Sequence, residues 1–305
     1  MTAEFDAKRD RAIGALVGLA VGDAIGTTLE FKRRDEQPPI ADMVGGGPFR
    51  LQAGEWTDDT SQALCLADSL IATSRLDQSD LIERFYRWAK EGYNSVNGRC
   101  FDIGNTTRKA LTKYKQTGIV QAGDDDEFSA GNGSLMRLSP VAIRWHNDTA
   151  EAREAAFLQS EVTHRAPEAL AACEYFAEIL VDAINGAQKA DVLARRNMPY
   201  AHGVARVAAG SWIGKTRDDI RSSGYVVDTL EAALWAVANN ESFADAVLAA
   251  ANLADDADTV AAVTGQLAGA LWGHDAIPDA WRQRLAWHDV IVEKARLLYD
   301  AARRS

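Results

Sequence analysis

The segment from residue 6 to residue 25 repeats apolar residues at helical spacing and places Gly14, Gly18 and Gly22 at four-residue intervals. A glycine inside a helix lowers its stability by about 1 kcal/mol relative to alanine. Such a loss is tolerated where another backbone must come close to the helix. We therefore expect a helix that ends near Gly26, with residues 27–30 directly after its last turn. We also expect another backbone to approach this helix closely.

Helical spacing recurs along most of the remaining chain. It predicts helices over residues 58–72, 149–161, 167–185, 226–239, 241–253, 256–272 and 288–303, and two more that begin after Asp77 or Ser79 and after Gly104. Loops are expected at 32–54, 92–103, 117–133 and 195–225, the last long enough to suggest function. Strict apolar/polar alternation never persists long enough for a sheet. We expect one all-α domain over residues 1–305, an orthogonal helical bundle whose inter-helix loops gather on one face.

The composition excludes several functions. A formal charge of −11 with no basic stripe argues against a nucleic-acid partner. Cys65, Cys100 and Cys173 form no CxxC pair, so disulfides and zinc are not expected, and a reducing compartment is favoured. The N-terminus lacks the pattern of a signal peptide, and we expect no apolar stretch of membrane-spanning length. The composition predicts a cytoplasmic protein with no membrane partner.

Two acidic segments stand directly ahead of apolar, helix-patterned runs: Thr57-Asp58-Asp59-Thr60 and Asp256-Ala257-Asp258-Thr259. Carboxylates and hydroxyls are the ligands that hard cations such as Mg²⁺ and Mn²⁺ take. If the two segments meet, they supply enough ligands for a pair of metal ions. Asp and Thr are also favoured N-caps, but further acids beside a cap repel one another unless a cation relieves them. Metal binding and capping are equally open from these residues alone.

Other candidates are single residues or one short loop. Glu30 is either a further metal-site carboxylate or an ordinary exposed helix-terminal residue, and Asp102 is either catalytic or a loop residue. The stretch Gly131-Asn132-Gly133-Ser134 offers backbone N–H groups and a hydroxyl for an anion, or forms a tight turn with a Ser cap. His164 and Tyr225 can each be ordinary packing residues. No Ser–His–Asp or Cys–His arrangement is visible, which disfavours covalent catalysis by Ser or Cys.

Taken together, these segments resemble the ADP-ribosylglycohydrolase family, and especially its dinitrogenase reductase-activating glycohydrolase branch. The resemblance runs in family order from residue 11 to about residue 273. It is carried by residues 14–31, 56–60, 102–106, 130–137, 163–164, 225–229 and 256–259. One departure is Ala254-Asp255, where the family commonly carries glycine. This departure removes no ligand, but it could alter the loop.

The resemblance implies an all-α hydrolase with two Mg²⁺ or Mn²⁺ ions at the base of a cleft. The implied metal ligands are Thr57, Asp58, Asp59, Asp256, Asp258 and Thr259. Glu30 is implied to stand beside the metals and hold or activate water, and Asp102 to face the scissile bond as an acid/base or orienting residue. The residues implied to line the ADP-ribose or complete the cleft are Gly104, Asn105, Gly131, Asn132, Gly133, Ser134, Met136, His164 and Tyr225.

The implied reaction is hydrolysis of the N-glycosidic bond of ADP-ribosyl-arginine on a protein, which releases ADP-ribose and restores arginine. The likeness of the Asp102 and Tyr225 segments to the arginine-directed branch favours this reaction over an O-linked substrate, such as serine-linked ADP-ribose or O-acetyl-ADP-ribose. A non-catalytic ADP-ribose-binding protein is a third alternative, disfavoured because all six ligand positions are intact. The expected partner is an ADP-ribosylated protein, and we expect the chain to act as a monomer.

Overall fold

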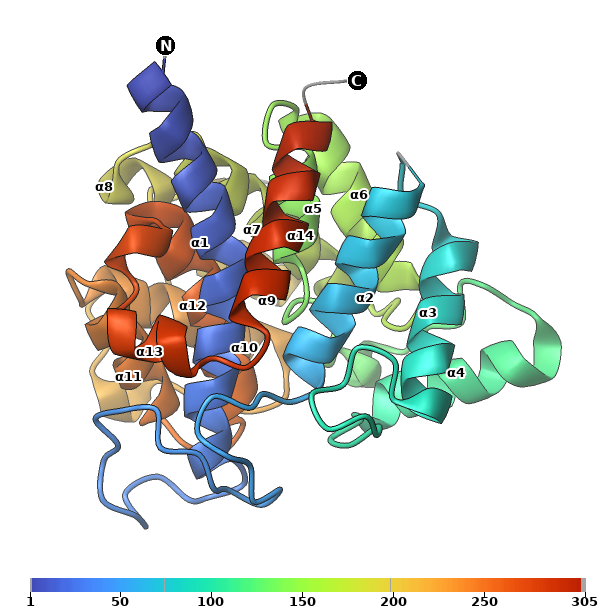
Figure 1. The fold of residues 1–305 in the computed structure, drawn as a ribbon, viewed down its shortest axis with the longest axis horizontal. Helices are drawn as coiled ribbons and strands as arrows, with labels where there is room; N and C mark the ends of the chain where they lie inside the picture. The colour runs from blue at the N-terminus through green and yellow to red at the C-terminus, as the bar shows by residue number, and fades with distance from the viewer. Residues whose placement is uncertain (1, 74, 198, 303–305) are drawn as a thin grey trace.

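The computed structural model describes residues 2–73, 75–197 and 199–302, which form helices, loops and a few isolated bridges (Figure 1). The α-helices are α1 (Thr2–Gly26), α2 (Asp58–Ala72), α3 (Gln78–Glu91), α4 (Asn105–Thr117), α5 (Ser139–Arg144), α6 (Thr149–Glu161), α7 (Pro167–Ile184), α8 (Lys189–Val192), α9 (His202–Ala208), α10 (Val226–Ala238), α11 (Phe243–Ala251), α12 (Ala257–Trp272), α13 (Asp279–Arg284) and α14 (His288–Ala301). Short 3₁₀ turns are η1 (Thr27–Leu29), η2 (Glu127–Ser129), η3 (Arg217–Asp219) and η4 (His274–Ala276). The all-α prediction is confirmed.

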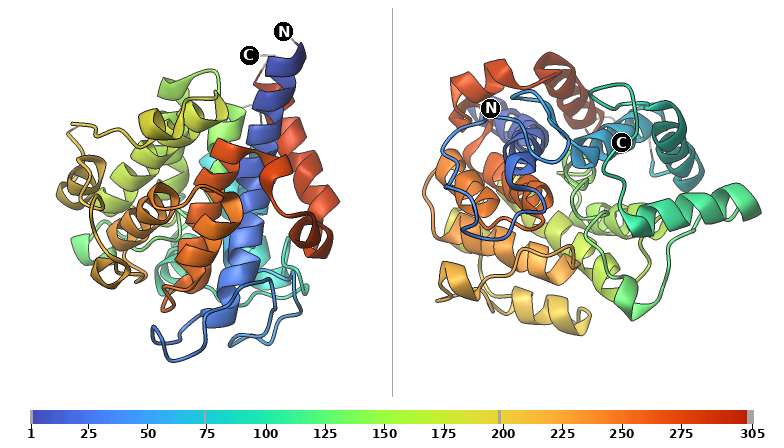
Figure 2. Two further views of the ribbon diagram at one scale, coloured as in Figure 1. Left: turned by 90° about the vertical axis from the view of Figure 1, so that its left-hand side faces the viewer. Right: turned by 90° about the horizontal axis from the view of Figure 1, so that it is seen from below.

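The centre of the molecule is the pair α1 and α12, which lie side by side (Figures 1 and 2). A Cβ added at Gly18 would lie 2.2 Å from the backbone oxygen of Gly265, and one at Gly22 would lie 2.1 Å from that of Ala261. Contacts this short leave no room for a side chain, so both glycines are required by backbone approach. Numbers rise along α1 as they fall along α12, so the helices are antiparallel. The predicted close approach is confirmed, and its partner is α12.

This antiparallel pairing brings the end of α1 to the beginning of α12. A Cβ at Gly26 would lie 2.2 Å from the backbone oxygen of Ala257. Beyond the helices, the Phe31 N–H donates to the Asp255 carbonyl at 2.8 Å, and the Asp255 N–H donates to the Lys32 carbonyl at 2.8 Å. The chain just after α1 is therefore hydrogen-bonded to the chain just before α12.

The loop before α12 contains the residues that depart from the family pattern. Ala254 and Asp255 have φ values of 59° and 61°. This left-handed conformation costs a non-glycine residue about 1–2 kcal/mol. The loop therefore has the backbone conformation that glycine adopts most easily, although the chain carries other residues there.

The remaining helices surround the central pair (Figure 2). Large side chains fill the space between them, including Trp56, Phe85, Trp88 and Phe176, all fully buried. The expected long irregular stretch at 195–225 instead contains α9 and η3, and α5, α8 and α13 were not predicted. These helices span four to seven residues, too few for apolar spacing to reveal a period.

The expectation that no apolar stretch has membrane-spanning length is wrong. The segment Asp6–Leu29 is long and apolar enough to cross a membrane. It belongs to α1 and η1, and 94% of its most apolar window is buried inside the protein. An apolar helix that is covered on all sides is what a core position requires.

Candidate active site

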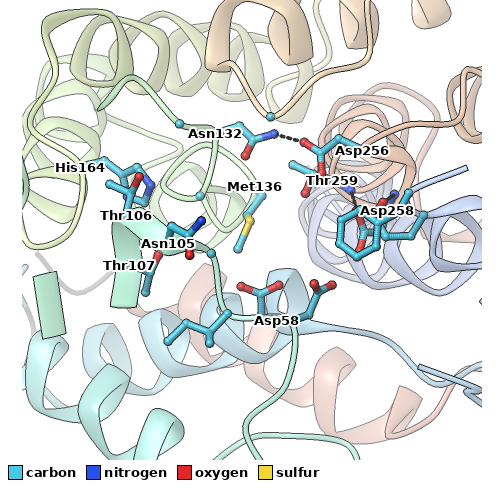
Figure 3. Close-up of a pocket in the computed structure, with 18 residues that line it drawn as sticks. Asp58, Asn105, Thr106, Thr107, Asn132, Met136, His164, Asp256, Asp258 and Thr259 are labelled. Atoms are coloured by element: carbon cyan, nitrogen blue, oxygen red, sulfur yellow. Dashed lines mark hydrogen bonds between the residues drawn. The ribbon is translucent and has the colours of Figure 1, made fainter. Parts of the chain in front are cut away.

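A cleft of about 490 Å³ opens where the end of α1 and the beginnings of α2, α4 and α12 meet two loops (Figure 3). Its lining comprises Glu30, Phe31, Asp58, Asp102, Ile103, Gly104, Asn105, Thr106, Thr107, Gly131, Asn132, Gly133, Met136, His164, Gly224, Asp256, Asp258 and Thr259. Most of these residues stand in inter-helix loops or in the first turn of a helix. Segments more than 200 residues apart in sequence therefore share one cavity.

One end of the cleft is acidic. Oxygen atoms of Glu30, Asp256 and Asp258 all lie within 4.8 Å of one another, and so do oxygen atoms of Asp23, Asp59 and Asp258. Asp258 belongs to both groups and joins them. The two acidic segments of the sequence therefore meet in the fold.

In the described part of the chain, no basic side chain neutralises these carboxylates by direct contact. Among the described residues, no Lys or Arg forms an ion pair with any of them, and Asp59 Oδ1 is buried without a hydrogen-bond partner. Burial, followed by the charge of Asp258, raises the pKa of Asp58 and of Glu30 far above the usual range. An oxygen-only, uncompensated set of this kind fits divalent cations such as Mg²⁺ or Mn²⁺.

Asp23 supports the acidic end from within α1. Its carboxylate accepts the Thr57 N–H and hydroxyl at 2.9 and 2.8 Å, and the Thr60 N–H and hydroxyl at 3.0 and 2.6 Å. Thr57 stands at the N-cap of α2, but its own side chain makes no capping bond. Asp23 takes over that task and fixes the beginning of α2 against α1. Sequence reasoning gave Asp23 no role, although an acid inside an apolar helix was a usable signal.

Two of the predicted metal ligands, Thr57 and Asp59, lie below the cleft surface. Both are buried and neither lines the cavity. The Thr57 hydroxyl lies 3.4 Å from Asp59 Oδ2 and 3.4 Å from Asp258 Oδ2. They therefore form the floor of the acidic end, while Asp58, Asp256, Asp258 and Thr259 reach the cavity.

The opposite end of the cleft carries amides, hydroxyls and an imidazole. Figure 3 shows Asn105, Thr106, Thr107 and His164 across the cavity from the acidic residues. Asn132 lies between the two ends, and its Nδ2 donates to Asp256 Oδ2 at 2.5 Å and to Thr229 Oγ1 at 2.8 Å. The cleft therefore has one end suited to cations and one end suited to an oxygen-rich ligand.

Asp102 faces the acidic end from a separate loop. It is half-buried, lines the cavity and has a φ of 58°. Burial, followed by the negative charges of Asp258 and Asp58, raises the pKa of Asp102 to about 11. Its carboxyl group therefore holds a proton at neutral pH while those charges stand uncompensated.

An aromatic row borders the same end. The rings of Phe31 and Phe49 lie 6.3 Å apart, and those of Phe49 and Phe101 lie 5.3 Å apart. Phe31 is 66% exposed, lines the cavity and follows Glu30 directly. Phe31 lies in the family-like segment 14–31, but its role was not predicted, because exposure of an aromatic side chain cannot be read from its sequence neighbours.

The ADP-ribosylglycohydrolase family model matches residues 5–305. The chain belongs to the ADP-ribosylglycohydrolase family. A solved structure described as an ADP-ribosylglycohydrolase-related protein complex is 41% identical, with a TM-score of 0.86 over 97% of this chain and 99% of that one. This protein is therefore a glycohydrolase with the all-α fold of that family.

Curated relatives carry more specific names. ADP-ribosylarginine hydrolase Tri1 of Pseudomonas putida (strain GB-1) is 54% identical, and the match covers 96% of this chain and 79% of the relative. The ADP-ribosyl-[dinitrogen reductase] glycohydrolase of Rhodospirillum rubrum is 35% identical, over 93% of this chain and 92% of the relative. Both matches extend over the segments of this ADP-ribosylglycohydrolase that line the cleft.

Two predicted cleft residues of this ADP-ribosylglycohydrolase lie elsewhere. The Ser134 side chain is fully buried, and its hydroxyl lies 2.8 Å from the Ser160 hydroxyl. The turn that follows Asn132 directs Ser134 inward, because the Leu135 and Met136 N–H groups both donate to the Asn132 carbonyl. The Tyr225 hydroxyl donates to Glu168, away from the cavity. The predicted ligand contacts of these two side chains are therefore not supported by their positions.

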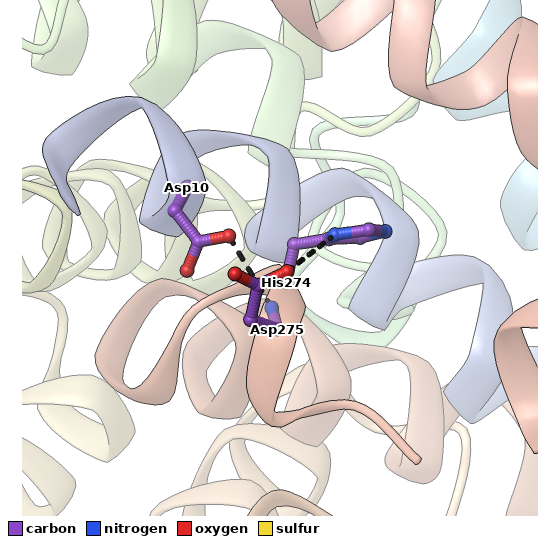
Figure 4. A group of neighbouring side chains, drawn as sticks. All are labelled: Asp10, His274 and Asp275. Carbon is purple, nitrogen blue, oxygen red and sulfur yellow. Dashed lines mark hydrogen bonds and ion pairs between the residues drawn. The ribbon is translucent and has the colours of Figure 1, made fainter. Parts of the chain in front are cut away.

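A third acidic group lies outside the cleft of this ADP-ribosylglycohydrolase and consists of Asp10, His274 and Asp275 (Figure 4). His274 Nε2 lies 3.1 Å from His288 Nε2, and His274 Nδ1 lies 3.2 Å from Arg282 Nη1. Both ring nitrogens are thus engaged by protein groups. This group offers no free imidazole to a metal ion.

Proposed function

We propose that this ADP-ribosylglycohydrolase hydrolyses the N-glycosidic bond between ADP-ribose and an arginine side chain of a modified protein. The observation that carries the proposal is the meeting of Glu30, Asp58, Asp256 and Asp258 at one end of a cleft, with Asp102 facing them. The name of the two Tri1 relatives, ADP-ribosylarginine hydrolase, supports the arginine linkage, and the name of the dinitrogen reductase relative supports a modified protein as substrate. The protein would act in the cytoplasm, as its composition predicts, and we expect it to act as a monomer.

The acidic end would hold two Mg²⁺ or Mn²⁺ ions. The proposed ligands are Thr57, Asp58, Asp59, Asp256, Asp258 and Thr259. When bound, the ions supply positive charge for ribose hydroxyls and pyrophosphate, and Lewis acidity that lowers the pKa of water. The protein itself carries a charge of −11, so this local positive charge is needed to attract an anionic substrate.

Glu30 and Asp102 would have different roles in the reaction: Glu30 would act on the attacking water, and Asp102 on the leaving group. Glu30 is buried against Asp256 and Asp258, where its carboxyl group can hold and orient a water molecule for attack on the ribose. Asp102 reaches the cavity from the facing loop and can donate a proton to the leaving nitrogen, or orient it. Ions bound at Asp58 and Asp258 would relieve the repulsion that helps to raise the pKa of Asp102 in the metal-free protein, so its burial is what would still favour the protonated acid.

The opposite end would bind the pyrophosphate and the ribose. Gly104 has no side chain to cap α4, so the N–H groups of Thr106 and Thr107 in its first turn receive no cap from it and would be available to an anion. Within the described residues, the Gly133 N–H donates to no protein carbonyl. These donors, with Asn105, Gly131, Asn132, Met136 and His164, fit an oxygen-rich ligand without a lysine.

Phe31 favours an arginine rather than a serine leaving group. A guanidinium remains positively charged when its nitrogen is joined to ribose, and a cation over an aromatic face gains about 0.5–2 kcal/mol. The exposed Phe31 ring stands beside Glu30 at the cavity wall. A serine oxygen offers no charge for that ring to attract.

The deciding experiment compares release of ADP-ribose from arginine-linked and serine-linked substrates, with Mg²⁺ or Mn²⁺ and then with EDTA. We expect metal-dependent release from the arginine substrate, its loss in Asp256→Ala, and a fall of about 10²–10⁴-fold in Asp102→Asn. Release from the serine substrate alone would overturn the arginine assignment. Tight ADP-ribose binding without turnover would instead identify a non-catalytic binding protein, and full activity of Asp102→Asn would remove Asp102 from the mechanism.

A further inference from the structure

Behind the cleft lies a fully buried arginine, Arg137. Its Nε donates to Gln159 Oε1 at 2.9 Å, and its Nη2 donates to the Gln159 carbonyl at 3.0 Å and to Thr163 Oγ1 at 2.8 Å. The guanidinium carbon lies 4.2 Å above the centre of the Phe85 ring. The ion pairs of the described residues include none with Arg137. A buried cation held only by neutral acceptors is costly, which points to a role beyond packing.

The direction of these hydrogen bonds is fixed, because a guanidinium has donors and no acceptor. The Thr163 oxygen must therefore accept from Arg137, and its own proton must point elsewhere. His164 Nδ1 lies 2.8 Å from that oxygen and is the acceptor within reach among the described residues. If Nδ1 accepts, the single proton of a neutral imidazole stands on Nε2.

The His164 ring is neutral. Burial, followed by the positive charge of Arg137, lowers the pKa of His164 to about 3. The His164 residue is 2% exposed, lines the cleft and lies against the loop 131–133, where a Cβ at Gly133 would lie 3.0 Å from Nε2. No hydrogen bond joins Nε2 to any described residue. Nε2 therefore lies at the cleft wall without a protein partner among the described residues, where a ligand in the cavity can accept from it.

The same guanidinium reaches toward the acidic end. Arg137 Nη1 donates to Gln62 Oε1 at 2.7 Å. The Gln62 amide must then turn its NH₂ group outward, where it donates to Asp58 Oδ2 at 2.7 Å. One buried cation therefore orients a hydrogen-bond donor at each end of the cleft.

We propose that Arg137 is a positioning residue that acts through Thr163 to hold His164 as its Nε2–H tautomer, a fixed hydrogen-bond donor to an oxygen atom of bound ADP-ribose. His164 is then a ligand-binding donor and not a general base. The identity of the ligand rests on the proposed function. The tautomer does not, because it follows from contacts inside the protein.

The first test reads the tautomer directly in the full-length, ligand-free protein. Two-bond ¹H–¹⁵N correlation spectra separate protonated from unprotonated imidazole nitrogens, and the chain has five histidines. A His164→Gln spectrum assigns the resonance. We expect an Nε2–H pattern for His164 that stays constant from about pH 5 to pH 9. An Nδ1–H pattern in the wild-type protein would overturn the proposal, whatever the variants show.

The second test removes the hydroxyl that transmits the effect. We expect Thr163→Val to mix the tautomers and weaken ADP-ribose binding about 10-fold, equivalent to about 1.4 kcal/mol, and Thr163→Ser to restore both. Thr112→Val is the matched control, since the Thr112 hydroxyl bonds only an exposed helix carbonyl. An unchanged tautomer in folded Thr163→Val would overturn the proposal. If the wild-type protein shows the Nε2–H tautomer but binds no ADP-ribose, the proposed function fails while the role of Arg137 and Thr163 stands.

Discussion

At the scale of single residues, Phe31 combines two unfavourable features. Its side chain is 66% exposed, and its φ of 59° lies in the left-handed region. That conformation costs about 1–2 kcal/mol for a residue with a Cβ. The hydrogen bond from its N–H to Asp255 and the neighbouring Phe49 ring hold it there. Such strain is concentrated at functional sites, which agrees with a role for the ring in substrate recognition.

A substitution at Phe31 tests that role. We expect Phe31→Leu to lower kcat/KM for the arginine-linked substrate by about 2–30-fold, because leucine keeps an apolar side chain but loses the aromatic face. Affinity for free ADP-ribose should stay within about 2-fold, since the product lacks the guanidinium. Phe128→Leu is the control, because Phe128 is 92% exposed and absent from the cleft lining. Equal losses for substrate turnover and ADP-ribose binding would contradict the assignment.

Asp58 and Asp258 were predicted to lie together because their neighbours repeat family motifs, and the fold places both at the acidic end of the cleft. Sequence reasoning gave no role to Asp23 because a carboxylate inside a helix reveals its partners only when the next helix is placed. The inward direction of the Ser134 side chain could not be predicted, because one tight turn decides whether that hydroxyl faces the cleft or the core. Backbone direction within a turn is set by tertiary contacts that a motif does not contain.

At the scale of elements, the pairing of α1 with α12 positions the active site. The glycine spacing predicted that some backbone approaches α1, but not which one. Gly265 and Gly269 carry the same four-residue spacing in α12, and a Cβ at Gly269 would come 1.9 Å from the Gly14 oxygen. Matching small residues on two segments were therefore a usable signal. Short helices such as α9 have too few residues for a repeated spacing of this kind to be recognised in the sequence.

A methyl group inserted in this interface should force the two helices apart. We expect Gly22→Ala to lower the free energy of unfolding by about 1–3 kcal/mol, because its Cβ would meet the Ala261 carbonyl at 2.1 Å. Gly104→Ala adds the same group where nothing lies within 4 Å and φ is −60°, so it should change stability by less than about 0.5 kcal/mol. Urea unfolding of both variants gives the comparison, and wild-type stability of Gly22→Ala would refute the close packing.

At the scale of the whole molecule, the protein must tolerate a concentration of buried negative charge. Burial and the charge of Asp258 raise the pKa of Asp23 and of Asp256 from 3.8 to about 7. Burial and neighbouring carboxylates also raise the pKa of Glu30, Asp58, Asp59 and Asp102, whereas burial lowers the pKa of His164 to about 3 and that of His274 to about 4. The six raised carboxyl groups outnumber the two imidazoles, so between about pH 4 and pH 7 the folded chain binds more protons than the unfolded chain. Stability of the metal-free protein therefore falls as pH rises from about 4 through about 7.

Melting temperatures measured in EDTA and in Mn²⁺ test this account. In EDTA we expect Tm to fall by several degrees, at about 2–4 °C per kcal/mol, between pH 5.5 and pH 8.5. Mn²⁺ should raise Tm more at pH 8.5 than at pH 5.5, because metal and protons compete for the same carboxylates. In EDTA, the Tm of the Asp256→Asn variant should fall less steeply with pH than that of the wild-type protein, because the variant has one titrating carboxyl group fewer. A Tm that is constant or rises with pH in EDTA would contradict the account.

The central helix pair has a consequence for synthesis of the chain. About 230 residues separate the end of α1 from the beginning of α12, and ribosomes add about 5–20 residues per second. The face of α1 that carries the glycines is therefore synthesised roughly 10–50 s before α12, the helix against which it packs. During that interval the nascent chain exposes a segment as apolar as a membrane span. Until α12 is synthesised, this segment can be covered only by the helices that precede α12, such as α2, α5 and α7, which pack against α1 in the finished protein.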